Sequence, residues 1–214
     1  VLLAAGASTF RFTPDGTQVL LTGALDTPGV LELYRVPSDG SAAPTRVSGP
    51  ALNGGDVRSF GLDPCAISAD GTRAVYAADH HLFGRQEIYS APLDQSSPAV
   101  RLNGTPVSGG AVQAAVLANA PMRISPDGTR VVYRADQEVN DRFELYSTPI
   151  DGSSAAVKIS GSILAQGDVQ GGTFAPSFAA VTDFRITPDG QRVVFRADRV
   201  ADGVFALFAA PIDG

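Results

Sequence analysis

A four-residue turn sequence recurs along the 214 residues of the chain. Its copies are Thr13-Pro14-Asp15-Gly16, Ser68-Ala69-Asp70-Gly71, Ser125-Pro126-Asp127-Gly128 and Thr187-Pro188-Asp189-Gly190. Each copy is followed by a second sequence that contains proline and ends in aspartate: Val36–Asp39, Ala91–Asp94, Thr148–Asp151 and Ala210–Asp213. The two aspartates are 24 residues apart in every copy. Four equal spacings indicate one rigid structural unit that is repeated four times.

Short β-branched and aromatic runs flank each turn, and such runs predict β-strands. The first strands are Phe10–Thr13, Cys65–Ser68, Met122–Ser125 and Phe184–Thr187, and the second are Val19–Leu21, Ala74–Tyr76, Val131–Tyr133 and Val193–Phe195. The third are Glu32–Tyr34, Glu87–Tyr89, Glu144–Tyr146 and Ala206–Phe208. Fourth strands are expected at Thr45–Ser48, Val100–Asn103 and Val157–Ser160. The hydroxyl, proline and glycine of the turn fit a type I turn between the first two strands.

Four antiparallel strands per unit, with no helical pattern between units, predict an all-β fold. A sandwich or a barrel is open at this point, but equal units that each need a neighbour on both faces favour a β-propeller. We therefore expect a single propeller domain over residues 1–214, built from four-stranded antiparallel blades. The repeats cover about residues 10–49, 65–104, 122–161 and 184–214. The third-strand aromatics Tyr34, Tyr89, Tyr146 and Phe208 are expected to lie buried between blades.

The last repeat ends before its fourth strand, and the apolar segment Val1–Ala4 precedes the first repeat. One interpretation is that residues 1–6 supply the closing outer strand of the last blade, which would place Leu2 or Leu3 beside Leu207 and Phe208. The other is that the chain is a piece of a larger array. Val1–Ser8 also has the apolar and small residues found at the end of a signal peptide.

The run Ile124-Ser125-Pro126-Asp127-Gly128-Thr129-Arg130-Val131-Val132-Tyr133, followed by Glu144-Leu145-Tyr146-Ser147-Thr148-Pro149-Ile150-Asp151-Gly152, resembles the TolB-type, WD40-like propeller repeat. The resemblance covers nearly the whole chain. It implies a propeller fold and is silent on activity, because such propellers serve as scaffolds, binding modules and enzyme domains. The chain departs from the family in its long inter-blade segments and in having four copies where such rings commonly hold six or more.

Composition excludes several classes of function. The net charge of −6 and the pI near 4.8 disfavour a nucleic-acid partner, which would need a basic face. No run approaches the roughly 20 apolar residues of a membrane span. Cys65 is the only cysteine, so the sequence has no intrachain disulfide and no cysteine-based zinc site.

The loop between the second and third strands of the third repeat is rich in oxygen ligands. Asp136, Glu138, Asn140 and Asp141 lie at close spacing there and suit Ca²⁺, the only cofactor that the sequence suggests. The loop lacks the glycine and the terminal glutamate of an EF-hand. The fourth repeat keeps only Asp198 and Asp202, so a solvated hairpin tip is the more ordinary interpretation.

Two other loop features are weaker candidates. The inter-blade segments 53–57, 107–112 and 165–169 align with one another, and long loops on one face of a propeller are common ligand sites. Their aspartates, Asp56 and Asp168, are replaced by Ala111 in one copy, and turn-forming glycines are the simpler interpretation. Asp79-His80-His81 contains both histidines of the chain; it is either part of a metal or acid–base site or an exposed loop.

Arginine recurs on the first strand, as Arg11, Arg123 and Arg185, with Ala66 in the second repeat. The first strand is the innermost strand of a blade, so these side chains either offer positive charge to the central channel for an anionic ligand or pair with acidic groups between blades. The sequence contains no G-x-S-x-G or H-E-x-x-H motif, and a serine triad would have to use His80 or His81.

These observations favour a non-catalytic binding or scaffold module of a secreted, periplasmic or cell-surface protein. Its partner would be a protein or glycan bound through the loops or the channel, and self-association is expected if the ring is incomplete. An accessory or gating propeller of a larger hydrolase, such as a serine peptidase, is the alternative. A self-contained hydrolase or lyase that uses the loop carboxylates with His80 or His81 is a third hypothesis.

Overall fold

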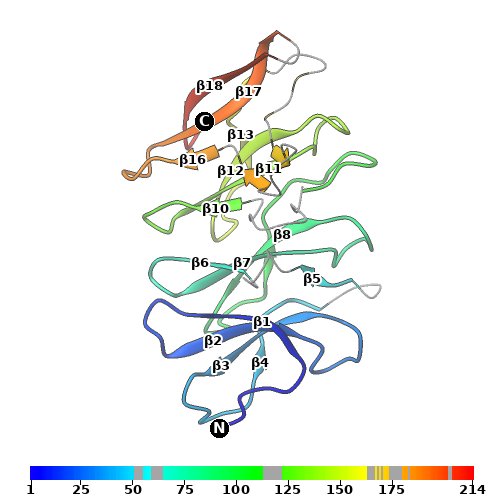
Figure 1. Cartoon of the computed structure of the whole chain (residues 1–214), viewed down its shortest axis with the longest axis vertical. Coiled ribbons are helices and arrows are strands. Elements are labelled where there is room, and N and C mark those ends of the chain that lie inside the picture. Colours follow the sequence, from blue (N-terminus) through cyan, green and yellow to red (C-terminus); the bar gives the residue numbers. More distant parts are fainter. Residues whose placement is uncertain are drawn as a thin grey trace. The chain divides into compact units, whose positions relative to one another are not determined.

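The computed structural model describes residues 1–50, 55–58, 65–112, 122–162, 167, 169, 171–173, 180–182, 184–201 and 204–214. These residues form 18 β-strands and no helix, which confirms the all-β prediction (Figure 1). Within this part of the chain there is accordingly no helix long and apolar enough to cross a membrane. The chain divides into two compact units, Val1–Arg101 and Leu102–Gly214, and each unit holds two of the predicted repeats.

The first unit contains blades one and two. Blade one is the antiparallel sheet β1 (Ala7–Phe12), β2 (Gln18–Gly23), β3 (Glu32–Pro37) and β4 (Thr45–Arg46), in that order. Blade two has β6 (Ala66–Ile67), β7 (Arg73–Ala78), β8 (Glu87–Pro92) and β9 (Val100–Arg101) in the same arrangement. One strand was not predicted: β5 (Val57–Arg58) pairs with the end of β7 beyond β6.

The second unit contains blades three and four. Blade three consists of β10 (Met122–Ile124), β11 (Arg130–Ala135), β12 (Glu144–Pro149) and β13 (Val157–Lys158). Blade four has three strands, β16 (Phe184–Ile186), β17 (Arg192–Ala201) and β18 (Val204–Pro211). A separate two-stranded sheet pairs β14 (Gly171–Thr173) with β15 (Ala180–Thr182). Both units therefore repeat one blade design, at the positions that the sequence predicted.

The repeated turn is held together by its own side chains. In each copy the hydroxyl of Thr13, Ser68, Ser125 or Thr187 donates a 2.5–2.6 Å hydrogen bond to the aspartate two residues later. The turn glycine donates its N–H to the carbonyl of the same hydroxyl residue at 2.8–2.9 Å, and its φ is positive in all four copies. The hydroxyl hydrogen bonds hold the pKa of Asp15, Asp70, Asp127 and Asp189 below the usual range. The turn chemistry predicted from the sequence is therefore present.

The second and third strands place matching rings opposite one another. Tyr76 pairs with Tyr89 and Tyr133 with Tyr146, and their rings stack at centroid distances of 5.6 and 5.5 Å. Tyr34, Tyr89 and Tyr146 are only 2%, 5% and 1% exposed, which confirms that they are buried, and Tyr34 packs with Leu3 and Ala4 of the N-terminal segment. Phe208 is half-buried against the core of the second unit.

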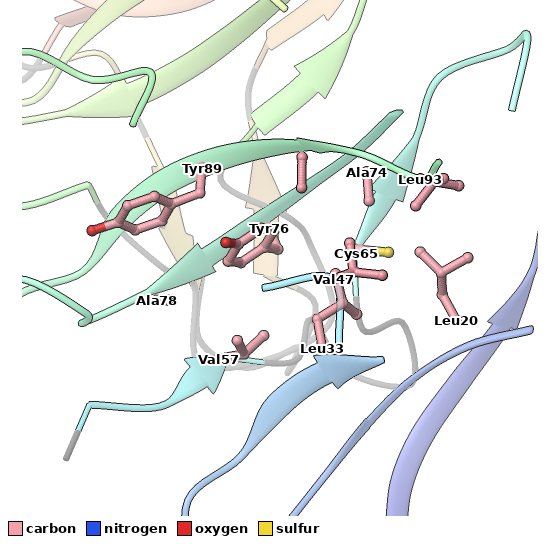
Figure 2. Packing of buried hydrophobic residues seen from close by; sticks show 11 residues of the cluster. Leu20, Leu33, Val47, Val57, Cys65, Ala74, Tyr76, Ala78, Tyr89 and Leu93 are labelled. Atoms are coloured by element: carbon pink, nitrogen blue, oxygen red, sulfur yellow. The ribbon is translucent and has the colours of Figure 1, made fainter. Parts of the chain in front are cut away.

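Blades pack face to face within each unit. In the first unit, Leu20, Leu33 and Val47 of blade one meet Cys65, Tyr76 and Tyr89 of blade two (Figure 2). In the second unit, Val132, Leu145 and Ile159 of blade three meet Phe184, Phe195 and Phe208 of blade four. Equivalent positions of the repeat therefore form the core in both units. The side chains of the second strands alternate between the two faces, and since both faces are packed, these strands are apolar almost throughout.

The inter-blade segments are tied to the following blade by one repeated device. Val57, Val112 and Val169 each pair with the equivalent alanine of the second strand of their blade, Ala78, Ala135 and Ala197. The glycine two residues before the valine lets the backbone pass close to the blade. A Cβ on Gly55 would lie 2.2 Å from the carbonyl oxygen of Asp79, and one on Gly110 would lie 2.5 Å from that of Asp136. Close backbone approach therefore favours glycine at these two positions, and the N–H of Gly110 also closes a turn on the carbonyl of Val107 at 3.0 Å.

The N-terminal segment lies on blade one. Leu3 and Ala4 pack against the cluster formed by Val19, Leu21, Tyr34 and Val36. Within residues 1–6 the structure assigns no strand, and β1 begins at Ala7. The closing role of residues 1–6 in the last blade stays a prediction.

Candidate functional site

The first-strand arginines of blades three and four meet at one backbone carbonyl. Nε of Arg123, on β10, donates to the carbonyl oxygen of Phe184 at 3.2 Å, and a terminal nitrogen of Arg185, on β16, donates to the same oxygen at 3.1 Å. The guanidinium of Arg123 also lies 5.8 Å from the centroid of the Phe184 ring. Burial, followed by the neighbouring positive charge of Arg185, lowers the pKa of Arg123. Two cations are thus held side by side on the inner strands of the second unit.

This geometry bears on both interpretations of the arginine repeat. Arg123 does link two blades, through the carbonyl and the aromatic ring of Phe184. Each guanidinium carries five N–H donors in a planar fork, which matches carboxylate and phosphate groups. Arg11 lies in the first unit, where it pairs with Leu20 across β1 and β2, and blade two has Ala66 at this position. The structure therefore brings together two of the three predicted arginines.

A second repeated cluster surrounds a buried glutamate at the start of the third strand. Glu32, Glu87 and Glu144 are 4%, 0% and 1% exposed. Tyr89 donates its hydroxyl to Glu87 at 2.8 Å, and Tyr146 donates to Glu144 at 3.1 Å. Burial, reinforced by the neighbouring carboxylate, raises the pKa of both tyrosines, so the hydroxyls keep their protons and act as donors.

A cation from the fourth strand completes each cluster. Arg101 lies 3.0 Å from Glu87, Lys158 lies 3.4 Å from Glu144, and Arg46 lies 3.7 Å from Glu32. Blade four has Ala206 and Phe208 in place of the glutamate and the tyrosine. Blade four thus lacks both the glutamate carboxylate and the tyrosine hydroxyl, so neither group is left there without the other. The pattern fits a structural role, since removing one partner of such a pair is costly while replacing the whole set by apolar groups is tolerated.

The Asp79-His80-His81 loop of blade two belongs to this second cluster. Asp79 and His80 are buried, so the interpretation of all three as exposed loop residues is wrong for these two. Burial lowers the pKa of His80 to about 4, which leaves its ring neutral between Tyr76 and Tyr89. His81 is half exposed; its Nδ1 lies 2.8 Å from the hydroxyl of Tyr89 and 3.3 Å from Glu87. The solvent-accessible imidazole of His81 is therefore hydrogen-bonded to the hydroxyl of Tyr89, which in turn donates to the buried carboxylate of Glu87.

The oxygen-bearing side chains of the blade-three loop each bind a different partner within the protein. Asp136 accepts the backbone N–H groups of Ala111 and Asp141 at 2.7 and 2.9 Å. Glu138 binds Lys158 at 2.7 Å, and Asn140 donates to the carboxylate of Asp141 at 2.8 Å. Among the described residues, no group of three or more histidine, cysteine, aspartate or glutamate side chains is arranged to hold a metal ion. Calcium binding by Asp136, Glu138, Asn140 and Asp141 stays a prediction.

The carboxylate of Asp79 in blade two accepts backbone N–H groups from the same two segments of the repeat as the carboxylate of Asp136 in blade three. Its carboxylate accepts the N–H of Asp56 at 2.6 Å and that of Gly84 at 2.8 Å, so it joins the inter-blade segment to the loop between the second and third strands. Two of the aspartates that suggested ligands in the sequence are therefore backbone acceptors. Asp168, Asp202 and the first residues of the segments 53–57 and 165–169 lie outside the described part of the chain.

A shallow groove of about 440 Å³ runs between blades one and two, at the edge that carries the repeated turns. Its lining includes Thr13, Asp15, Arg35, Arg73 and Asp94. The sequence did not single out this groove, because its residues come from the ends of strands in two different repeats and only the packing of the blades places them together.

Comparison with solved structures supports the fold. A protein from Agrobacterium tumefaciens assigned as TolB superposes with a TM-score of 0.52 at 18% identity, over 97% of this chain and 62% of that one. An oligogalacturonate lyase in complex with manganese superposes with the same TM-score and identity, over 91% of this chain and 45% of that one. Both are β-propeller proteins, and the fold of the chain is that of β-propeller blades, as its repeat predicted.

An oligogalacturonate lyase from Vibrio parahaemolyticus is also similar, at 13% identity and a TM-score of 0.46 over 95% of this chain and 61% of that one. The chain thus spans less than two thirds of the length of these neighbours. No family model matches the sequence, and no curated protein matches it.

Proposed function

We propose that the chain is a non-catalytic β-propeller module that binds an anionic ligand through the inner-strand arginines of its second unit. The observation that carries this proposal is the convergence of Arg123 and Arg185 on the carbonyl oxygen of Phe184. Two guanidinium groups held side by side repel each other, and an anion that accepts hydrogen bonds from both relieves that repulsion. Their rigid attachment to adjacent inner strands reduces the entropy lost on binding.

The ligand class that fits best is an acidic glycan or an acidic segment of a protein. One structural neighbour is named for oligogalacturonate, a chain of sugar carboxylates, which is the kind of group that a pair of guanidiniums recognises. A secreted, periplasmic or cell-surface location goes with such a ligand and forms part of the proposal. Many of the buried charged groups described above already serve the blade structure, which also favours binding over catalysis.

A lyase is the second candidate, favoured by the same neighbour and by the contact of His81 with Tyr89 and Glu87. In this arrangement the half-exposed imidazole would accept a proton, and the buried pair would orient it. The role of an accessory propeller in a larger hydrolase also stays open, since the chain spans only part of the length of its neighbours. The length of the full gene product tests that role.

Titration calorimetry with oligogalacturonate, and with a neutral oligosaccharide of the same length, tests the main proposal. Wild-type protein is expected to bind only the acidic chain. Arg123→Gln and Arg185→Gln should each weaken binding by roughly tenfold or more, the effect of losing a charge-assisted hydrogen bond. Arg192→Gln, at an exposed arginine at the start of β17, is the matched control and should bind as wild type. Equal affinity of wild type and both arginine variants would refute the site.

The same samples separate binding from cleavage. The proposal predicts that the oligosaccharide is recovered intact after prolonged incubation with wild-type protein. Cleavage that is abolished by His81→Gln and retained by Arg192→Gln would replace the main proposal with the lyase.

A further inference from the structure

Blade one departs from the repeat at a position that lines the groove between blades one and two. In blades two and three, the arginine at the start of the second strand donates its Nε to a serine of the third strand at 2.9 Å: Arg73 to Ser90, and Arg130 to Ser147. Blade one has Arg35 at the position of that serine. Arg35 lines the groove together with Arg73. The departure from the repeat therefore brings a second guanidinium group to this groove.

Both guanidinium groups have hydrogen-bond donors left for a ligand. The bond from Arg73 to Ser90 uses Nε, which leaves the two terminal nitrogens of Arg73. Within the described part of the chain, no hydrogen bond or ion pair engages the guanidinium of Arg35. Both arginines are half-buried. Because half-buried donors face less competition from water, they bind a carboxylate more strongly than fully exposed donors do.

Each wall of the groove also carries a carboxylate, Asp15 from blade one and Asp94 from blade two. Both aspartates are exposed. Hydrogen bonds from the hydroxyl of Thr13 and from Thr17 hold the pKa of Asp15 below its usual range. Hydrogen bonds from the backbone N–H and the hydroxyl of Ser96 do the same for the pKa of Asp94. Both carboxylates are therefore ionised at neutral pH.

The four charges of the groove restrict the chemistry of a ligand. Each wall supplies one cation and one anion, and the walls are fixed, since Leu93 in the lining belongs to the same buried cluster as Leu20 of blade one. A ligand with negative charge alone is attracted by the guanidinium groups but repelled by the carboxylates, and a cation meets the reverse. A ligand that carries both charges is complementary to both pairs.

We propose that this groove binds a small zwitterion of the size of an amino acid or a short peptide with free termini. The carboxylate of the ligand accepts hydrogen bonds from Arg35 and Arg73, and its ammonium group donates to Asp15 and Asp94. The groove volume of about 440 Å³ lies within the range of small-molecule sites, roughly 300–1,000 Å³. The site lies wholly within the first unit and shares no residue with the arginine pair of the second unit, so it is independent of the anionic ligand proposed above.

Triglycine and two blocked derivatives test the chemistry of the ligand. N-acetyltriglycine lacks the ammonium group, and triglycine amide lacks the carboxylate. In titration calorimetry, wild-type protein is expected to bind triglycine and to bind each derivative about tenfold or more weakly, because each derivative loses one charge-assisted pair of contacts. No binding of triglycine, or equal affinity for triglycine and either derivative, overturns the proposal.

Other blades of the same chain supply the variants. Arg35→Ser introduces the residue of blades two and three, and Arg73→Gln introduces the residue that blade one has at this position, Gln18. The repeat accepts both side chains, and thermal unfolding verifies that both variants are folded. Each should weaken triglycine binding about tenfold or more. Arg130→Gln is the matched control, because it removes the equivalent arginine and its serine hydrogen bond outside the groove. It should bind triglycine as wild type does.

Two further variants separate the two ends of the ligand and the two binding sites. Asp94→Asn keeps an acceptor for the N–H of Ser96 but removes the negative charge, so it should reduce the preference for triglycine over N-acetyltriglycine. Arg123→Gln, in the second unit, should leave triglycine binding unchanged while it weakens the binding of oligogalacturonate. Wild-type affinity for triglycine in both Arg35→Ser and Arg73→Gln would overturn the site in the groove, whatever the result with oligogalacturonate.

Discussion

The buried tyrosine of blade three provides the sharpest test of how a blade is held together. Tyr146 is 1% exposed, stacks on Tyr133 and donates its hydroxyl to the buried carboxylate of Glu144. Tyr146→Ala removes the ring, its stacking contact with Tyr133 and the hydroxyl. It should lower the free energy of unfolding by about 3–5 kcal/mol. Tyr146→Phe removes only the hydrogen bond to Glu144 and should cost about 1–2 kcal/mol.

Blade four shows how this cost is avoided, and this suggests a double-mutant cycle. Ala206 and Phe208 stand there where blade three has Glu144 and Tyr146. In a Glu144→Ala background, Tyr146→Phe should therefore cost about 0.5 kcal/mol or less, since the hydroxyl no longer has a carboxylate to bind. The 2.7 Å contact of Lys158 with Glu138 does not involve Glu144 and is expected to remain in that background.

Urea unfolding followed by circular dichroism measures all four proteins of the cycle. Val157→Ala, at a 38% exposed position on the neighbouring strand, is the control and should change the free energy of unfolding by about 0.5 kcal/mol or less. A loss below about 1 kcal/mol for Tyr146→Ala would show that the ring does not pack in the core. Equal costs of Tyr146→Phe with and without Glu144 would show that the acid–phenol pair is not coupled.

Three further predictions concern other parts of the chain. His80 has a folded-state pKa of about 4, below its unfolded value of 6.5, so its contribution to stability is complete above pH 6.5 and is lost as the pH falls toward 4. Urea unfolding should therefore show a smaller loss of stability between pH 7 and pH 5 for His80→Phe than for wild type. Equal losses would contradict the burial of this ring. The melting temperature in excess chelator should match that in calcium, because Asp136 and Glu138 are occupied by backbone N–H groups and by Lys158; a rise of several degrees with calcium would establish a metal site in this loop. Deletion of residues 1–6 should lower the melting temperature of the first unit and promote aggregation, since it uncovers Val19, Leu21, Tyr34 and Val36, whereas unchanged melting and light scattering would show that Leu3 and Ala4 do not stabilise that face.

Local chemistry made most of the fold predictable. The turn sequences place hydroxyl, aspartate and glycine at fixed positions, and the apolar runs beside them are long enough to define strands. The two-residue strand β5 and the pairing of Val112 and Val169 were missed, because they depend on where a distant segment meets the end of a second strand. Such pairing depends on contacts between residues about 20 or more positions apart, which periodicity within a short window does not detect.

The candidate sites were predicted less completely. The sequence singled out Arg123 and Arg185 by their repetition, but their convergence on Phe184 depends on how blades three and four pack. Glu87 and Glu144 went unnoticed as a buried set, although their loss in blade four together with the tyrosine hydroxyl was a usable signal. Repetition of a residue type between repeats identifies a candidate position. Two positions that change together between repeats, as the glutamate and the tyrosine do in blade four, indicate side chains that contact each other.

A crystal structure of the chain with bound oligogalacturonate would show whether Arg123 and Arg185 hold the ligand. We expect a sugar carboxylate within hydrogen-bond distance of the guanidinium groups of both Arg123 and Arg185. We also expect an intact glycosidic chain in the crystal. A carboxylate bound elsewhere, with Arg123 and Arg185 making the same contacts as in the free protein, would contradict this expectation.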